Sequence, residues 1–109
     1  MSTKLSLTEL IELRNANPDV ILLEALPEKY YRDGHLPGAR HLPHDQVSQL
    51  APQLLSNLDA EIVVYCASAT CRNSDIAAQA LDQLGYSHVA VFPGGKEAWV
   101  DAGLPLDRQ

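Results

Sequence analysis

The stretch that decides the fold is EIVVYCASATCRNSDIAAQAL, residues 61–81. A short β-branched run ends on Cys66, and a loop of small residues separates that cysteine from an amphipathic helix expected from Asn73 to Leu84. This order places the thiol at the carboxyl end of a strand and in front of a helix N-terminus. Unpaired N–H groups and the helix dipole favour an anion there. We therefore expect a low pKa for Cys66 and a nucleophilic thiolate near neutral pH.

The segments on either side repeat the alternation of strand and helix. Further helices are expected at 7–15, in a short turn that Pro27 opens, at about 47–55 with an interruption at Pro52, and at 96–102. Strands are expected at 20–23, 40–42, 62–65 and 88–92. Short connections between alternating elements predict an α/β fold with a mostly parallel central sheet covered by helices on both faces. Functional loops of such sheets lie beyond the carboxyl ends of the strands.

The helix ends carry their own signals. Ser6-Leu-Thr-Glu9 is a capping box for the first helix, and Asn73 or Ser74 is a candidate cap for the helix after the loop. Gly85 is placed to stop that helix. Its expected apolar face comprises Ile76, Ala77, Ala80, Leu81 and Leu84.

Length and composition narrow the function classes. The chain has 109 residues and a net charge of −6, which predicts one domain over residues 1–109 and argues against a nucleic-acid partner. No apolar run approaches the roughly 20 residues of a membrane helix, and the polar opening has no signal-peptide pattern, so we expect a cytoplasmic protein. Two cysteines do not make a disulfide framework, and the histidines show no metal-ligand spacing. Neither a metal nor an organic cofactor is implied.

Three blocks in order give the chain a resemblance to a known family. They are Gly34-His-Leu-Pro-Gly-Ala39, then Val63-Val-Tyr-Cys66, then Gly94-Gly95 followed by Trp99 and Gly103-Leu-Pro105. From about Ser6 to Pro105 the chain resembles a single-domain rhodanese. The resemblance implies a sulfurtransferase in which Cys66 takes up a sulfane sulfur as a persulfide. The implied donor is thiosulfate or another persulfide, and the implied acceptor is cyanide or a thiol, including a protein thiol.

The resemblance also implies the substrate-binding residues. The backbone N–H groups of the loop would cradle the anionic sulfur, and the loop comprises Ala67, Ser68, Ala69, Thr70, Cys71 and Arg72. Two departures stand out. The loop is longer than the commonest rhodanese loop and fits a subgroup with the pattern C-x4-C-x-x-S. Glu24-Ala-Leu26 replaces the Asp-Val-Arg that many rhodaneses carry, so the arginine of that motif is missing.

Two other functions stay open on these residues. Cys66 and Arg72 satisfy C-x5-R, the signature of cysteine-dependent phosphatases and of some arsenate reductases, in which the guanidinium grips an oxyanion. Alternatively, Cys66 and Cys71 form a persulfide carrier or redox sensor without turnover. Cys71 itself is a packing residue, a resolving thiol or half of a reversible disulfide. Arg72 is either an anion binder or an exposed residue at the helix start.

Overall fold

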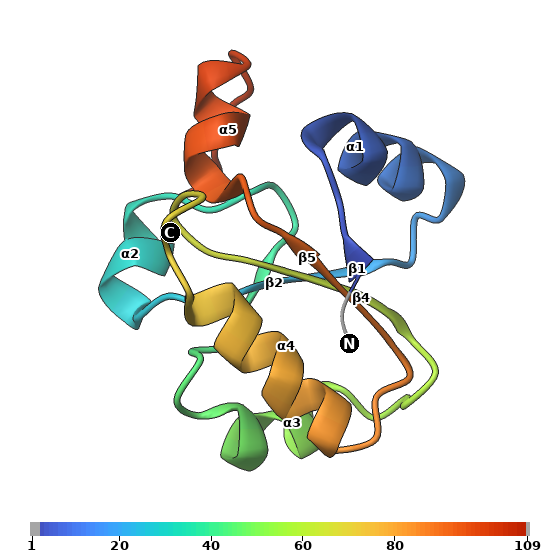
Figure 1. Ribbon diagram of the computed structural model, residues 1–109. Helices are drawn as coiled ribbons and strands as arrows, with labels where there is room; N and C mark the ends of the chain where they lie inside the picture. Colours follow the sequence, from blue (N-terminus) through green and yellow to red (C-terminus); the bar gives the residue numbers. More distant parts are fainter. Residues whose placement is uncertain (1–2, 109) are drawn as a thin grey trace.

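The computed structural model describes residues 3–108, which form a five-stranded, all-parallel sheet in the order β1-β5-β4-β2-β3. The strands are β1 (Thr3–Lys4), β2 (Ile21–Glu24), β3 (Arg40–His41), β4 (Glu61–Tyr65) and β5 (His88–Phe92). Strand β4 lies at the centre, paired with β2 on one side and β5 on the other (Figure 1). The expected α/β class with a parallel sheet is therefore confirmed.

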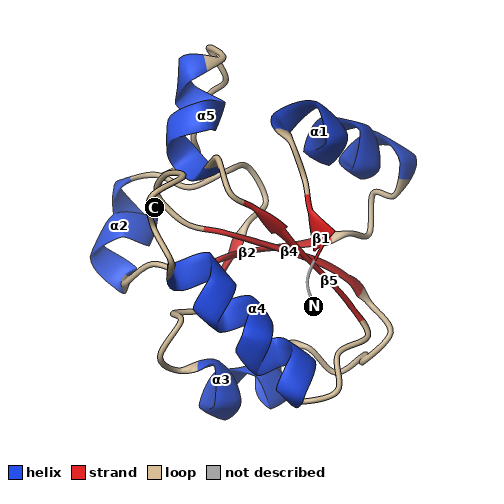
Figure 2. Ribbon diagram, in the orientation of Figure 1, coloured by secondary structure: helices blue, strands red, loops and turns tan. Residues whose placement is uncertain are grey.

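Helices cover both faces of this sheet (Figure 2). One face carries α1 (Leu7–Ala16) and α5 (Gly95–Asp101), and the other carries α3 (Val47–Leu54) and α4 (Asn73–Gln83). Helix α2 (Glu28–Asp33) follows β2. No helix formed by residues 3–108 is long and apolar enough to cross a bilayer.

Burial on both faces explains why the inner strands are continuous apolar runs. Because successive side chains of a strand point to opposite faces, neighbouring residues enter different cores. Leu22, Val63 and Tyr65 pack under α1 and α5, whereas Leu23, Ile62 and Val64 pack under α3 and α4. The two cores fix the sheet, and with it the position of the residue that follows β4.

Several local expectations are corrected by the structure. Strand β1 was not expected, because its two exposed residues carry no apolar signal and are ordered by pairing with β5. Pro52 lies inside α3 and does not end that helix. The buried side of α4 comprises Ser74, Ala77, Ala78 and Leu81, so the predicted apolar face is rotated. Ile76 and Leu84 are exposed.

Two predicted helix signals are confirmed. Ser6 Oγ accepts a hydrogen bond from the Glu9 N–H (3.1 Å), and the Glu9 carboxylate accepts one from the Ser6 N–H (2.8 Å). Gly85 follows α4 with φ of 98°, a left-handed conformation that glycine adopts without strain. The cap expected at Asn73 or Ser74 is wrong: Arg72 takes the N-cap position without a side-chain hydrogen bond.

Candidate active site

Cys66 follows β4 directly and is clamped against the start of α5. Its carbonyl oxygen accepts a hydrogen bond from the Lys96 N–H (3.0 Å), and the Glu97 N–H donates to the Ala67 carbonyl oxygen (2.9 Å). Gly95 has φ of 60°, and a Cβ at that position would overlap the Cys66 carbonyl oxygen. The absence of a side chain at Gly95 therefore allows the start of α5 to pack directly against the backbone of Cys66.

The Cys66 thiol points inward, beneath the loop. Its side chain is buried, with the residue 1% exposed. Sγ lies 3.4 Å from the Cys71 carbonyl oxygen and 3.4 Å from Ser74 Oγ, so the thiol can donate to either oxygen. Both cysteines are free thiols. The Ser74 hydroxyl contacts the thiol instead of capping its own helix, which explains the failed cap prediction.

The predicted low pKa of Cys66 is wrong in this structure. Burial raises the pKa of the Cys66 thiol, and its hydrogen bond to Cys71 raises it further. The Ser74 hydroxyl and backbone N–H act in the opposite direction, because they stabilise a thiolate. Helix α4 does begin beside the thiol, as the sequence predicted. Its pKa-lowering effect on Cys66 is smaller than the increase caused by burial.

The pKa of Cys71, the second cysteine of the loop, is shifted in the opposite direction. Burial, the largest influence, raises the pKa of the Cys71 thiol, but the hydrogen bond from Cys66 and backbone hydrogen bonds from Ala67 and Asn73 together lower the pKa below its ordinary value. Cys71 is also only partly buried. Of the two thiols, Cys71 is therefore the one that ionises at lower pH and meets solvent.

The rest of the loop forms an exposed turn over the thiols. The Cys71 N–H donates to the Ser68 carbonyl oxygen (3.0 Å), and the hydroxyls of Ser68 and Thr70 are 3.1 Å apart and bonded to each other. Within residues 3–108, the N–H groups of residues 67–70 donate to no backbone carbonyl. The Ala67 N–H already bonds the Cys71 thiol, so the three amides of residues 68–70 are available to an anion, whereas the two hydroxyls are engaged with each other.

Arg72 lies at the end of the loop with its side chain in solvent. It occupies the N-cap position of α4 in helical conformation. Its guanidinium makes no hydrogen bond or ion pair with any residue from 3 to 108. The structure therefore brings Cys66, Cys71 and Ser74 together but does not bring the Arg72 side chain to the thiol.

A buried ion pair, which the sequence did not reveal, joins Glu24 to Lys96. Glu24 is 0% exposed, and its Oε2 lies 2.9 Å from Lys96 Nζ. The Tyr65 hydroxyl donates to Glu24 Oε1 (2.7 Å) and accepts from the Leu36 N–H (3.0 Å). Lys96 also donates to the Tyr30 carbonyl oxygen (2.7 Å). The signal was a carboxylate at the end of an apolar strand, because such a residue needs a buried cation.

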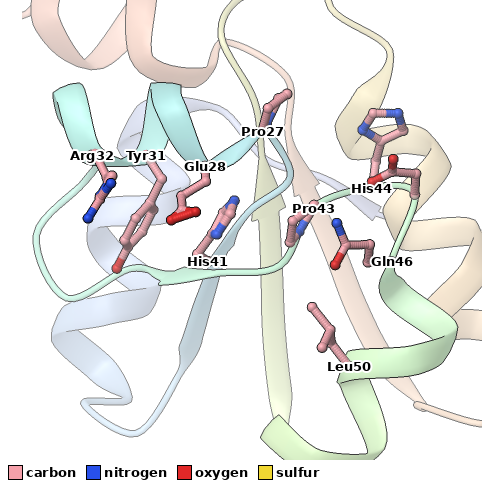
Figure 3. A pocket seen from close by; sticks show the side chains of 10 residues that line it. Pro27, Glu28, Tyr31, Arg32, His41, Pro43, His44, Gln46 and Leu50 are labelled. Carbon is pink, nitrogen blue, oxygen red and sulfur yellow. The ribbon is translucent and has the colours of Figure 1, made fainter.

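A pocket of about 500 Å³ opens at the neighbouring strand ends, between α2 and the segment that leads into α3 (Figure 3). Its lining does not include Cys66. Backbone hydrogen bonds link the pocket residue His44 to the strand that precedes Cys66. The His44 N–H donates to the Ala25 carbonyl oxygen (3.1 Å), and the Ala25 N–H donates to the Tyr65 carbonyl oxygen (3.0 Å). The lining comprises Pro27, Glu28, Tyr31, Arg32, His41, Pro43, His44, Asp45, Gln46 and Leu50.

His35 is a buried residue of the loop before β3. It is 6% exposed, its Nδ1 lies 2.9 Å from the Tyr31 carbonyl oxygen, and its ring stacks on the Tyr31 ring with centroids 4.0 Å apart. No cluster of three or more His, Cys, Asp or Glu side chains among residues 3–108 is arranged to hold a metal ion.

Comparison with known proteins places this site in a family. The model of the rhodanese-like domain matches residues 6–102, so the chain belongs to the rhodanese-like family. Membership of this family supports sulfurtransferase-type or related cysteine-based activity.

Individual relatives are larger proteins. An HTH-type transcriptional regulator of Mycobacterium tuberculosis is 32% identical over 91% of this chain and 42% of its own length. Protein HIGH ARSENIC CONTENT 1, mitochondrial, of Arabidopsis thaliana is 30% identical over 79% of this chain and 56% of its own length. The thiosulfate sulfurtransferase of Pseudomonas aeruginosa superposes with a TM-score of 0.80 at 26% identity, over 98% of this chain and 20% of that one. The chain thus spans about half the length of the Mycobacterium tuberculosis regulator and of the Arabidopsis thaliana protein.

Proposed function

We propose that this protein is a sulfurtransferase that carries sulfane sulfur as a persulfide on Cys66. The donor is thiosulfate or another persulfide, and the acceptor is cyanide or a thiol, including a protein thiol. The observation that carries the proposal is the position of Cys66 at the end of β4, beside the Ser74 hydroxyl and next to a loop in which the N–H groups of residues 68–70 donate to no backbone carbonyl.

The chemistry of the two half-reactions fits these contacts. The Cys66 thiolate attacks the outer sulfur of thiosulfate, the sulfur–sulfur bond breaks, and sulfite leaves. Cyanide or a thiolate then attacks the outer sulfur of the persulfide and restores the Cys66 thiolate. Anionic sulfur is present in both steps, and Ser74 donates to it through its hydroxyl and backbone N–H. These two donors offset part of the cost of forming the thiolate in a buried position.

The same geometry disfavours a phosphatase or an arsenate reductase. Those reactions need a guanidinium on the oxyanion, but the Arg72 side chain is exposed and makes no hydrogen bond or ion pair with residues 3–108. Cys66 Sγ contacts Cys71 and Ser74 instead.

Steady-state formation of thiocyanate from thiosulfate and cyanide tests the proposal. We expect turnover by the wild-type protein and none by Cys66→Ser. Ser74→Ala should be slower by on the order of tenfold near neutral pH, because a hydrogen bond to a charged sulfur contributes about 1.5 kcal/mol or more. The exposed ion pair of Lys4 and Asp75 offers a matched control, and Lys4→Met should keep wild-type turnover. Turnover that survives Cys66→Ser, or hydrolysis of an aryl phosphate that Arg72→Ala abolishes, would contradict the proposal.

A further inference from the structure

The two thiols of the loop are arranged unequally. Cys66 is closed off from solvent, whereas Cys71 is partly exposed. The Cys71 N–H donates to the Ser68 carbonyl oxygen, and the Cys71 carbonyl oxygen lies 3.4 Å from Cys66 Sγ. A persulfide formed on Cys66 is therefore poorly accessible to a bulky acceptor, but Cys71 already lies beside its inner sulfur.

We propose that Cys71 is a resolving thiol, which discharges the Cys66 persulfide as hydrosulfide by forming a Cys66–Cys71 disulfide. This second activity rests on the sulfurtransferase function proposed above and adds a sulfide-releasing branch to it. Cys71 attacks Sγ of the persulfidated Cys66, a new bond forms between the two Sγ atoms, and the bond to the outer sulfur breaks. The thiol proton of Cys71 goes to the leaving sulfur, which departs as hydrosulfide. An external dithiol then reduces the disulfide and returns both thiols.

The position of attack follows from contact. In the resting structure, the Cys71 carbonyl oxygen lies 3.4 Å from Cys66 Sγ, the atom that becomes the inner sulfur of the persulfide. Attack there expels hydrosulfide. Attack on the outer sulfur would instead expel the Cys66 thiolate and move the sulfur to Cys71. The nucleophile is favoured as well, since Cys71 has the lower pKa of the pair.

The sequence separation is compatible with such a bridge. Four residues lie between the cysteines, and all are small and at least partly exposed, so the loop can adjust to the dihedral angle that a disulfide needs. The backbone of Cys71 is held by two contacts: its N–H donates to the Ser68 carbonyl oxygen, and its carbonyl oxygen contacts Cys66 Sγ.

A single-discharge experiment tests the proposal. Wild-type, Cys71→Ser and Cys66→Ser proteins are reduced, incubated with thiosulfate, desalted without added thiol, and followed by hydrosulfide trapping and intact-protein mass spectrometry. The wild-type protein should release hydrosulfide stoichiometrically with its loading and lose two hydrogen atoms of mass. Both cysteines lie in the tryptic peptide 41–72, so the same mass loss should map to that peptide.

The variants separate this proposal from the function on which it rests. Loaded Cys71→Ser, and Cys71→Ala as a second variant, should keep the sulfur atom and discharge more slowly by on the order of a hundredfold, because an adjacent thiol replaces a bimolecular encounter. Equal discharge from wild type and both variants, or a wild-type persulfide that persists beside a free Cys71, would overturn the resolving role and leave the sulfurtransferase function standing. Failure of the wild type and both Cys71 variants to gain sulfur would remove both proposals.

Discussion

Removal of the Lys96 ammonium should destabilise the fold far more than removal of an ordinary surface lysine. Lys96→Met would leave the Glu24 carboxylate, which is 0% exposed, without its cation at 2.9 Å. Loss of one partner from a buried pair costs about 3–5 kcal/mol, because the remaining charge is uncompensated. Domains of this size have a total unfolding free energy of about 5–15 kcal/mol, so the variant should be marginal.

Urea denaturation followed by far-UV circular dichroism measures this effect. With an m-value of about 2 kcal/mol/M, a loss of about 4 kcal/mol lowers the midpoint by about 2 M. The matched control is Lys4→Met, which breaks the exposed pair with Asp75 and should cost about 0–1 kcal/mol. The double variant Lys96→Met/Glu24→Gln should recover part of the loss, since it removes the buried charge. A Lys96→Met midpoint equal to that of Lys4→Met would refute the reasoning.

Three further predictions concern the site and its support. Gly95→Ala should lower both stability and thiocyanate formation, because a Cβ meets the Cys66 carbonyl oxygen and φ is positive; normal activity in this variant would show that the contact is dispensable. Iodoacetamide alkylation, mapped by mass spectrometry across pH, should modify Cys71 at a lower pH than an ordinary cysteine and Cys66 only at a higher pH, since the thiolate fraction follows the lowered and raised pKa values; the opposite order would contradict the assigned directions. Tyr65→Phe should lower the unfolding free energy by about 1–3 kcal/mol in urea titrations, because Glu24 loses a buried donor; an unchanged midpoint would count against that hydrogen bond.

The architecture could be read from the sequence because several signals agreed. Continuous apolar strands, a capping box at Ser6 and a stop at Gly85 all specified the same alternating elements. The two-residue strand β1 was not predictable, because its order comes from pairing with β5 and its side chains are exposed. The apolar face of α4 was rotated because Ser74, a polar residue, is buried against the thiol, while Ile76 faces solvent.

The candidate site was predictable in position but not in electrostatics. Cys66 could be placed at a strand end from local pattern alone, whereas its burial depends on how the loop folds over it. The ion pair of Glu24 and Lys96 joins elements that are distant along the chain, so no local sequence pattern could predict it. The same holds for the contact of Gly95 with the Cys66 carbonyl oxygen.

The most direct test of the central claim is intact-protein mass spectrometry of reduced Cys71→Ser before and after thiosulfate, with Cys66→Ser beside it. The account predicts that the Cys71→Ser protein gains one sulfur atom, which cyanide removes, and that Cys66→Ser gains none. A Cys66 that remains open to alkylation but takes up no sulfur, or a gain that persists in Cys66→Ser, would contradict it.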